Sequence, residues 1–360
     1  MAGLPLGWRL RRFCALCGSG TGRVLLWLPW MIEERRNMKR YIFGAALTAL
    51  AAPTAVLAQD QCGDVTITQM NWDSAAIVTQ VSKFLMEQGY GCNVTAVPSD
   101  TTPAMTSLSE NNEPDIVTEL WTNSAGEAYT KLKADGKIVE LGSVLDPGGV
   151  EGWFLPTYLV EEHPELATID GIMANPELVG GMFNNCPDGW GCRIVNDNLI
   201  RAFGLDEKGI EIFNHGSGET LATSMASAYG DEKAWFGYYW GPTTPLGMFD
   251  MTSIDLGDYD EEAFTAMQNA DATDPTPSSF PSAPVLTIVT KDFMDSHPDV
   301  SEMMGKVTFK TDVMSQLLAW KEDNNASNQE AAVYFLKNNP DAWSSWINDS
   351  AREKLSALLQ

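Results

Sequence analysis

The sequence predicts an α/β protein built from two lobes. Short runs rich in β-branched and aromatic residues alternate with helical patterns, which is typical of strands joined by crossover helices. The alternation occurs twice, once before residue 150 and once after residue 168, with an extended segment between the two series. The 302 residues after position 58 are enough for two domains, so we expect a mostly parallel sheet in each lobe.

The first series consists of three strand–helix units. Ser74 is a candidate N-cap of the first helix, and Gly89 is its candidate C-terminal glycine. We expect strands over 64–72, 93–98 and 115–121 and helices over 74–89, 102–111 and 125–141. In open parallel sheets, ligands bind beyond the carboxyl ends of the strands. The ends of these strands are therefore candidate site positions.

The second series follows an extended segment at 152–164, which we interpret as the crossing between the lobes. We expect helices over 168–179, 195–203 and 217–230, strands over 209–214 and 234–240, and a hairpin-like loop before residue 195. A later strand at 284–293 and a helical tail indicate that the chain returns to the first lobe. We accordingly assign the first lobe to 59–155 and 245–360, and the second lobe to 156–244.

The beginning of the chain has the pattern of a secretory signal. "MKRYIFGAALTALAAPTAVLAQ" starts at Met38 with two basic residues, continues with an apolar stretch and ends in small residues, which predicts cleavage after Ala58. Residues 1–37 precede this complete signal, so we expect translation to begin at Met38. The alternative is a membrane anchor around Val24–Ile32, but that apolar run has only nine residues. We therefore predict an exported, periplasmic protein.

The charge of the chain excludes two classes of partner. The first 58 residues hold eight of the 23 basic residues and two of the 48 acidic ones, so the remaining 302 residues carry 15 basic and 46 acidic residues and a net charge of −31. Such a chain repels nucleic acid and anionic membrane surfaces. It suits a salty medium, where screening weakens the repulsion between like charges.

Four cysteines remain after the leader: Cys62, Cys92, Cys186 and Cys192. In an exported protein this number indicates two disulfides, and three pairings are possible. We favour Cys62–Cys92, which ties the starts of two strands together, and Cys186–Cys192, which closes the short loop "CPDGWGC". The alternative is a set of free, buried thiols.

Four tryptophans share an unusual place in the predicted elements. Each lies at the end of a strand or in the crossing segment, where a cleft between the lobes would open: Trp72, Trp121, Trp153 and Trp240. Indole faces attract a cation whose charge is spread over methyl groups, with about 0.5–2 kcal/mol from each face when water is excluded. The alternative for each is simple packing in a core. Trp190 lies in the cysteine loop and is not assigned to this set.

Enzymatic functions are poorly supported, and we expect no catalysis. His163 and His297 each precede a proline, as expected for residues at the start of a helix. His215 lies near Ser217 in "NHGSGE", but the strand–turn–helix elbow of a nucleophilic serine is missing. The sequence contains no phosphate-binding loop or dinucleotide fingerprint. A sugar-binding protein is the second binding hypothesis, because tryptophans also stack on sugar rings.

Several segments resemble a known family. "NWDSA", "DIVTELW", "GWFLPTYL" and "FGYYWGPTTPLG" are similar to segments of the substrate-binding proteins of ABC importers for glycine betaine, choline and related compounds, and the resemblance covers most of residues 62–350. It implies a periplasmic binding protein of type II, whose two lobes close like a flytrap on a trimethylammonium group. It also implies an ABC permease in the inner membrane as partner, and we expect a monomer. By motif position, the aromatic box would consist of Trp72, Trp121, Trp153 and Trp240.

The identity of the ligand depends on the charges near this box. No Arg or Lys is adjacent in sequence to any of the four tryptophans, whereas Glu119 lies two residues before Trp121 on the same side of the strand. A carboxylate there disfavours glycine betaine and favours choline, or trimethylamine N-oxide that shares a proton with Glu119. The pattern of four Trp and one Glu most resembles the trimethylamine N-oxide-binding proteins of marine bacteria. The alternative for Glu119 is a solvated carboxylate outside the cleft. The alternative function is a glycine betaine- or choline-binding protein of the same family.

The same resemblance implies an additional hairpin that holds a metal ion. The counterpart here would be "FNNCPDGWGC", in which Asn184, Asn185 and Asp188 offer oxygen ligands suited to Ca²⁺. The spacing matches no standard calcium loop, and the alternative is a turn closed by a disulfide without a metal. No cofactor is otherwise required, and a structural Ca²⁺ is the single metal we expect.

Overall fold

The computed structural model describes residues 62–358, which all belong to the compact unit Leu57–Gln360. The predicted start at Met38 and cleavage after Ala58 lie outside the described residues. Within 62–358, no helix combines the length and the apolar character needed to cross a membrane.

The first lobe is built on a five-stranded sheet in the order β2-β1-β3-β11-β4. Its strands are β1 (Gly63–Met70), β2 (Cys92–Ser99), β3 (Ile116–Trp121), β4 (Ile138–Ser143) and β11 (Val285–Thr290). β1 is parallel to β2 and β3, whereas β11 runs antiparallel to β3 and β4. A small additional sheet pairs β5 (Leu145–Asp146) with β12 (Phe309–Lys310).

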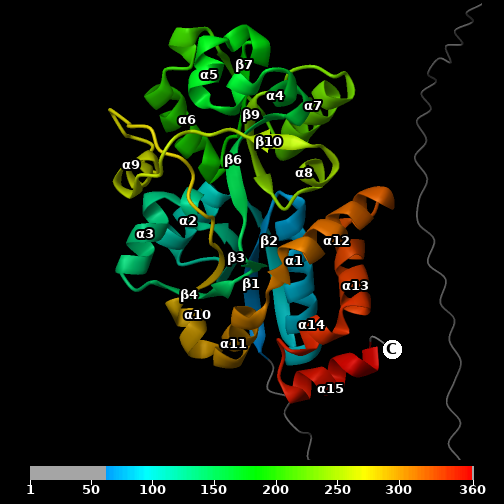
Figure 1. Ribbon diagram of the computed structural model, residues 1–360. Coiled ribbons are helices and arrows are strands. Elements are labelled where there is room, and N and C mark those ends of the chain that lie inside the picture. Colours follow the sequence, from blue (N-terminus) through cyan, green and yellow to red (C-terminus); the bar gives the residue numbers. More distant parts are fainter. Residues whose placement is uncertain (1–61, 359–360) are drawn as a thin grey trace, which may run out of the picture. The chain divides into compact units, whose positions relative to one another are not determined.

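Helices cover both faces of the first sheet. Those of this lobe are α1 (Asp73–Leu85), α2 (Thr101–Asn111), α3 (Gly126–Ala134), α10 (Lys291–Ser296), α11 (Pro298–Lys306), α12 (Thr311–Asp323), α13 (Asn328–Asn338), α14 (Pro340–Ser344) and α15 (Asp349–Leu358). Figure 1 shows α1, α12 and α13 together on one side of the strands and α2 and α3 on the other. Both faces bury apolar side chains, as expected for a sheet inside an α/β lobe.

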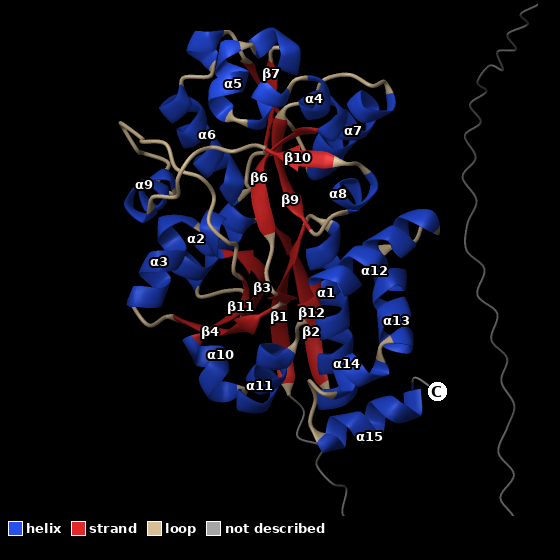
Figure 2. Ribbon diagram, in the orientation of Figure 1, coloured by secondary structure: helices blue, strands red, loops and turns tan. Residues whose placement is uncertain are grey.

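The second lobe has its own sheet, in the order β10-β6-β9-β7-β8 (Figure 2). Its strands are β6 (Val150–Pro156), β7 (Met182–Asn185), β8 (Glu211–Asn214), β9 (Gly237–Gly241) and β10 (Met251–Ser253). Its helices are α4 (Thr157–Glu162), α5 (Ile169–Ala174), α6 (Gly191–Phe203), α7 (Gly218–Gly230), α8 (Thr244–Met248) and α9 (Glu261–Met267). Short 3-10 or π turns occupy Met86–Tyr90, Thr122–Ser124, Pro164–Ala167, Pro176–Val179 and Asp206–Lys208.

The two-lobed α/β fold is confirmed, with a correction of detail. Each sheet is mixed rather than mostly parallel, because each contains two parallel and two antiparallel pairings. In the first sheet the antiparallel pairings arise because the returning strand β11 inserts between β3 and β4. In the second sheet they arise because β6 enters antiparallel to β9.

The strands also place the lobe boundaries differently from the predicted 155/156 and 244/245. β6 pairs with β9 and β10, so 150–156 and 251–253 both belong to the second sheet. An antiparallel bridge joins Gly149 to Ala283 beside the crossing chain segments. Of the extended segment predicted at 152–164, residues 152–156 therefore belong to the interior strand β6, whereas Thr157–Glu162 form helix α4. The predicted disulfides Cys62–Cys92 and Cys186–Cys192 are both present.

Candidate functional site

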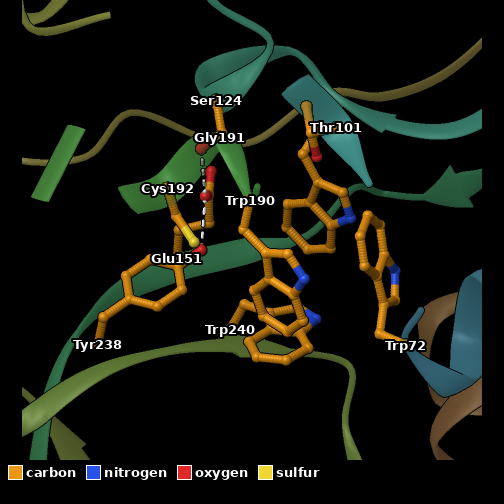
Figure 3. Close-up of a pocket in the computed structure, with 10 residues that line it drawn as sticks. Trp72, Thr101, Ser124, Glu151, Trp190, Gly191, Cys192, Tyr238 and Trp240 are labelled. Atoms are coloured by element: carbon orange, nitrogen blue, oxygen red, sulfur yellow. Dashed lines mark hydrogen bonds between the residues drawn. The ribbon is translucent and has the colours of Figure 1, made fainter. Parts of the chain in front are cut away.

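Residues of both lobes line a single cavity, shown in Figure 3. Four of the lining residues are tryptophans: Trp72 and Trp121 from the first lobe, and Trp190 and Trp240 from the second. The other six are Thr101, Ser124, Glu151, Gly191, Cys192 and Tyr238. None of these ten residues is Lys or Arg.

Each of the four indoles lies at the end of an element or in a strand close to the segments that cross between the lobes. Trp72 is the N-cap of α1, and Trp121 is the last residue of β3. Trp240 lies in β9, and Trp190 is the N-cap of α6. The ring centroids of Trp190 and Trp240 are 4.8 Å apart, and those of Trp72 and Trp190 are 5.5 Å apart, both in edge-to-face geometry. The rings therefore form one aromatic cluster that spans the two lobes.

Glu119 lies behind the two indoles of the first lobe. Its Oε1 accepts hydrogen bonds from Trp72 Nε1 at 2.6 Å and from Ser74 Oγ at 2.7 Å, and it lies 3.4 Å from Trp121 Nε1. The side chain is fully buried but is not among the residues that line the cavity. The structure thus brings Glu119 to the predicted tryptophans, where it acts as an anchor for their N–H groups.

An irregularity of the sheet directs Glu119 toward these donors. Val117 pairs with Ile288 and Leu120 with Leu286, so two residues of β3 lie opposite the single residue Thr287. Such a bulge re-aims a side chain. Glu119 has φ 51°, a left-handed conformation that is uncommon for a residue with a Cβ. Burial raises the pKa of the Glu119 carboxyl to about 7, although the hydrogen bonds from Ser74, Trp72 and Trp121 oppose that shift.

Glu151 is the carboxyl group that does line the cavity, and the sequence analysis missed it. It belongs to β6 and is buried, and its Oε1 accepts hydrogen bonds from Tyr238 Oη at 2.8 Å and Ser124 Oγ at 3.0 Å. Its Oε2 has no partner among the described residues. Burial raises the pKa of this carboxyl, against the effect of the Tyr238 and Ser124 hydrogen bonds. An acidic residue two positions before Trp153 in the crossing segment was the signal that could have identified it.

Trp153 was predicted as a wall of the box, and the structure corrects this. Its side chain is fully buried inside the second lobe, packed against Phe183, Phe203 and Phe236. Its Nε1 donates to Asn196 Oδ1 of α6 at 2.9 Å. Trp153 is therefore a core residue, because α6 covers this part of β6. Trp190, in the loop that precedes α6, contributes the fourth indole instead.

The three residues predicted to hold Ca²⁺ do not fit a calcium site. Asn184 Oδ1 bonds His215 Nε2 at 3.0 Å, and Asn185 Oδ1 accepts from the backbone N–H of Cys186 at 2.8 Å. The carboxylate of Asp188 forms an ion pair with Arg193 at 2.6 Å. The three side-chain oxygens thus have different partners, and the guanidinium group of Arg193 lies beside the Asp188 carboxylate. No cluster of three or more acidic, His or Cys side chains suited to a metal occurs in 62–358.

The residues that could suggest a nucleophilic serine have structural partners. Ser217 caps α7, where its hydroxyl accepts from the backbone N–H of Thr220 at 3.3 Å. His215 is buried, and burial lowers its pKa. Its Nε2 is engaged with Asn184. Ser217 therefore stabilises the start of α7, and the hydrogen bond between His215 and Asn184 ties the segment before α7 to β7.

Comparison with known proteins identifies the fold independently. The chain resembles the glycine betaine/L-proline-binding protein ProX of Borrelia burgdorferi at 18% identity and a TM-score of 0.67, covering 81% of this chain and 99% of that one. It resembles a choline-binding protein of an ABC transporter, solved with choline, at 18% identity and a TM-score of 0.66, covering 83% and 99%. It resembles lactococcal OpuAC, solved in its closed form with glycine betaine, at 18% identity and a TM-score of 0.63, covering 79% of this chain and 100% of that one.

These structures share the two-lobed fold of type II periplasmic binding proteins. A family model described as the substrate-binding domain of ABC-type glycine betaine transport systems matches residues 63–338, which is most of the chain. The resemblance predicted from sequence segments is thereby confirmed at the level of the family. The chain belongs to the OpuAC family of substrate-binding domains of ABC-type glycine betaine transport systems.

Proposed function

We propose that this protein captures trimethylamine N-oxide between its lobes and delivers it to the membrane permease of an ABC importer. In this proposal the trimethylated nitrogen is enclosed by the four indoles of the aromatic cluster, Trp72, Trp121, Trp190 and Trp240. The polar end of the ligand is held by Glu151, which the hydroxyl groups of Tyr238 and Ser124 orient. Export with cleavage near Ala58 would place the protein in the periplasm.

The single observation that carries the proposal is the division of the cluster between the lobes. Two indoles come from each lobe, and all four line one cavity. Each desolvated face contributes about 0.5–2 kcal/mol toward a methylated cation, so four faces supply roughly 2–8 kcal/mol before the cost of ordering the ligand. Ligand capture and lobe closure are then one event, because neither half of the cluster encloses the cation alone.

The groups at the polar end favour a ligand without a carboxylate. Glu151 Oε2 has no partner in the described chain, and no Lys or Arg lines the cavity. Because burial raises the pKa of Glu151, its protonated form can donate a hydrogen bond to an N-oxide oxygen. The carboxylate of glycine betaine would instead meet a second carboxyl group without a compensating cation.

Choline is the second candidate, and one observation favours it. Its hydroxyl group can donate to the unpaired Oε2 of an ionised Glu151, while its fixed positive charge is attracted by the same carboxylate. The N-oxide remains our first choice because its oxygen is attached directly to the nitrogen. It therefore needs less space beside rings that already approach to 4.8 Å.

Titration calorimetry tests the ligand class. The protein is titrated with trimethylamine N-oxide, choline, glycine betaine and maltose, and we expect the N-oxide to bind most tightly. Trp190→Ala should weaken binding roughly tenfold, as expected for the loss of one desolvated cation–π wall. Trp320→Phe is the matched control, because Trp320 stacks on Tyr334 in the tail helices and does not line the cavity. Maltose binding without binding of a methylated amine would refute the proposal.

Glu151→Gln separates the two candidate ligands. The amide oxygen can keep the hydrogen bonds from Tyr238 and Ser124, which leaves the NH₂ group at the position of Oε2. An NH₂ group donates to an N-oxide oxygen, so N-oxide binding should be retained. Choline loses both the negative charge and the acceptor for its hydroxyl, so its binding should fall. Equal loss of both ligands would contradict the role given to Glu151.

A further inference from the structure

The loop that presents Trp190 is held rigidly within the second lobe. It runs from Cys186, directly after β7, to Cys192, the second residue of α6, and the disulfide Cys186–Cys192 closes it at both ends. The guanidinium of Arg193 donates to Asp188 at 2.6 Å and to Asp197 at 2.9 Å. Asp188 lies in the loop and Asp197 in α6, so Arg193 ties the loop to the helix that follows it.

The same loop makes direct contacts with the first lobe. The backbone N–H of Thr102, at the start of α2, donates to the carbonyl of Gly189 at 3.0 Å. Trp190 Nε1 donates to Asn71 Oδ1, between β1 and α1, at 2.8 Å. Backbone and indole N–H groups thus bond across the cleft at two separate segments. The loop therefore recognises the first lobe as well as presenting an aromatic wall.

Gly191 lies too close to Ser124 of the first lobe for a side chain to fit. A Cβ at Gly191 would lie 1.6 Å from the carbonyl oxygen and 3.0 Å from the Cβ of Ser124. Gly191 does not have a positive φ, so its backbone conformation is open to residues with a Cβ. Gly191 is also the first residue of α6, where alanine is a good helix former. Only the nearness of the other lobe requires glycine here.

We propose that loop 186–192 is the latch of lobe closure and that Gly191 is the positioning residue that permits the latch to seat. The latch brings Trp190 into the cavity and docks on Asn71, Thr102 and Ser124 in one movement. Ser124 is shared with the polar end of the site, because its Oγ donates to Glu151 at 3.0 Å (Figure 3). The inference extends the proposed function, in which closure around a methylated amine completes the site.

Gly191→Ala tests the latch, with Gly216→Ala as its matched control. Both glycines lie in the second lobe, but a Cβ at Gly216 meets nothing within 4 Å. Wild type and both variants are measured by small-angle X-ray scattering and calorimetry with trimethylamine N-oxide, choline and glycine betaine in turn. We expect wild type and Gly216→Ala to contract with ligand. Gly191→Ala should stay expanded, bind at least tenfold more weakly and keep the thermal unfolding midpoint of the ligand-free protein.

Contraction and tight binding by Gly191→Ala would overturn the latch. An unfolding midpoint that falls in the ligand-free variant would also overturn it, because the glycine would then be required within the second lobe itself. Tight binding of glycine betaine alone would refute the proposed ligand, yet the latch would still be decided with that compound. The two proposals therefore fail on different results.

Discussion

The two halves of the aromatic cluster are held in different ways. In the first lobe, the indole N–H groups of Trp72 and Trp121 both point to one buried carboxyl, Glu119, of the same lobe. In the second lobe, Trp190 is held by a disulfide-closed loop, and its N–H bonds Asn71 of the opposite lobe. In the proposed closing movement, the first half is therefore preorganised, whereas the second half gains the hydrogen bond from Trp190 to Asn71 only when the lobes meet.

This comparison shows where the protein stores conformational strain. Glu119 combines a left-handed backbone, full burial and a raised pKa, each of which is unfavourable in itself. In the second half, Trp190 donates to the Asn71 amide instead of a fully buried carboxyl, and the disulfide closes its loop covalently. A preformed half reduces the ordering cost that a ligand meets on first contact. The predictions below test this division.

The largest expected effect is that of Glu119→Ala. It removes the acceptor of Trp72, Ser74 and Trp121 and leaves buried donors without partners, each costing about 1–3 kcal/mol. We expect stability at pH 6 to fall by about 3 kcal/mol and ligand affinity to fall with it. Denaturant unfolding and calorimetry measure the two quantities. Glu119→Gln, which keeps an acceptor oxygen, is the control. Similar losses in both variants would contradict the role given to the acceptor oxygen.

The pH dependence of stability follows from the raised pKa of Glu119. The carboxyl titrates near pH 4.3 in an unfolded chain and at about 7 in the fold, so the folded state binds more protons between these values. Wild-type stability relative to Glu119→Gln should therefore fall as the pH rises from about 4.3 to 7, by on the order of 2–3 kcal/mol, and then stay constant. Unfolding of both proteins at pH 5 and pH 8 measures this difference. A difference that does not change with pH would be evidence against the buried charge.

Removing the loop disulfide should disturb mainly the second half. Cys186 and Cys192 are six residues apart, and a loop of this size contributes about 2 kcal/mol in the chain-entropy model. The Cys186→Ser, Cys192→Ser double variant should lose about that much stability, together with ligand affinity, because Trp190 is no longer held. The matched variant, Cys62→Ser with Cys92→Ser, should lose stability but retain ligand affinity at temperatures where it is folded. Retained affinity in the loop variant would show that the bridge does not order Trp190.

Trp153→Phe should have the smallest effect on function. The substitution removes the hydrogen bond to Asn196 and part of the packing with Phe183, at a cost of about 1 kcal/mol in stability. Ligand affinity should change by less than about threefold, because this indole is outside the cavity. Calorimetry beside Trp190→Ala gives the comparison. A loss of affinity as large as that of Trp190→Ala would show that Trp153 contributes to ligand binding.

The strand ends were predictable because they depend on local patterns. β-branched runs placed Trp72 and Trp121 at the ends of two predicted strands, and the structure brings both to the cavity. In detail, β1 ends at Met70, and Trp72 instead of Ser74 is the N-cap of α1. Trp240 was likewise predicted at the end of a strand, and it lies in β9. The alternation of strand residues also placed Glu119 on the side of Trp121, although a bulge completes the contact.

The remaining positions depended on elements distant in sequence. Trp153 and Glu151 lie two residues apart in β6, but α6 covers the first and leaves the second at the cavity. Trp190 lies in the loop after β7 and not at the end of a strand, and the approach of the first lobe brings it to Trp72. The order of the strands was likewise set by β11 inserting between β3 and β4.

The sequence by itself determined the two lobes, the favoured disulfide pairs and the tryptophans at the strand ends, while the family followed from the resemblance of several segments. The lobes, the disulfides and the strand ends follow from periodicity, composition and spacing, which act over a few residues. Only the tertiary structure decided which indoles and which carboxyl face the cavity. The physical reason is that exposure to a cleft depends on what packs against each face, and for Glu151 and Trp190 the covering or facing elements come from other parts of the chain.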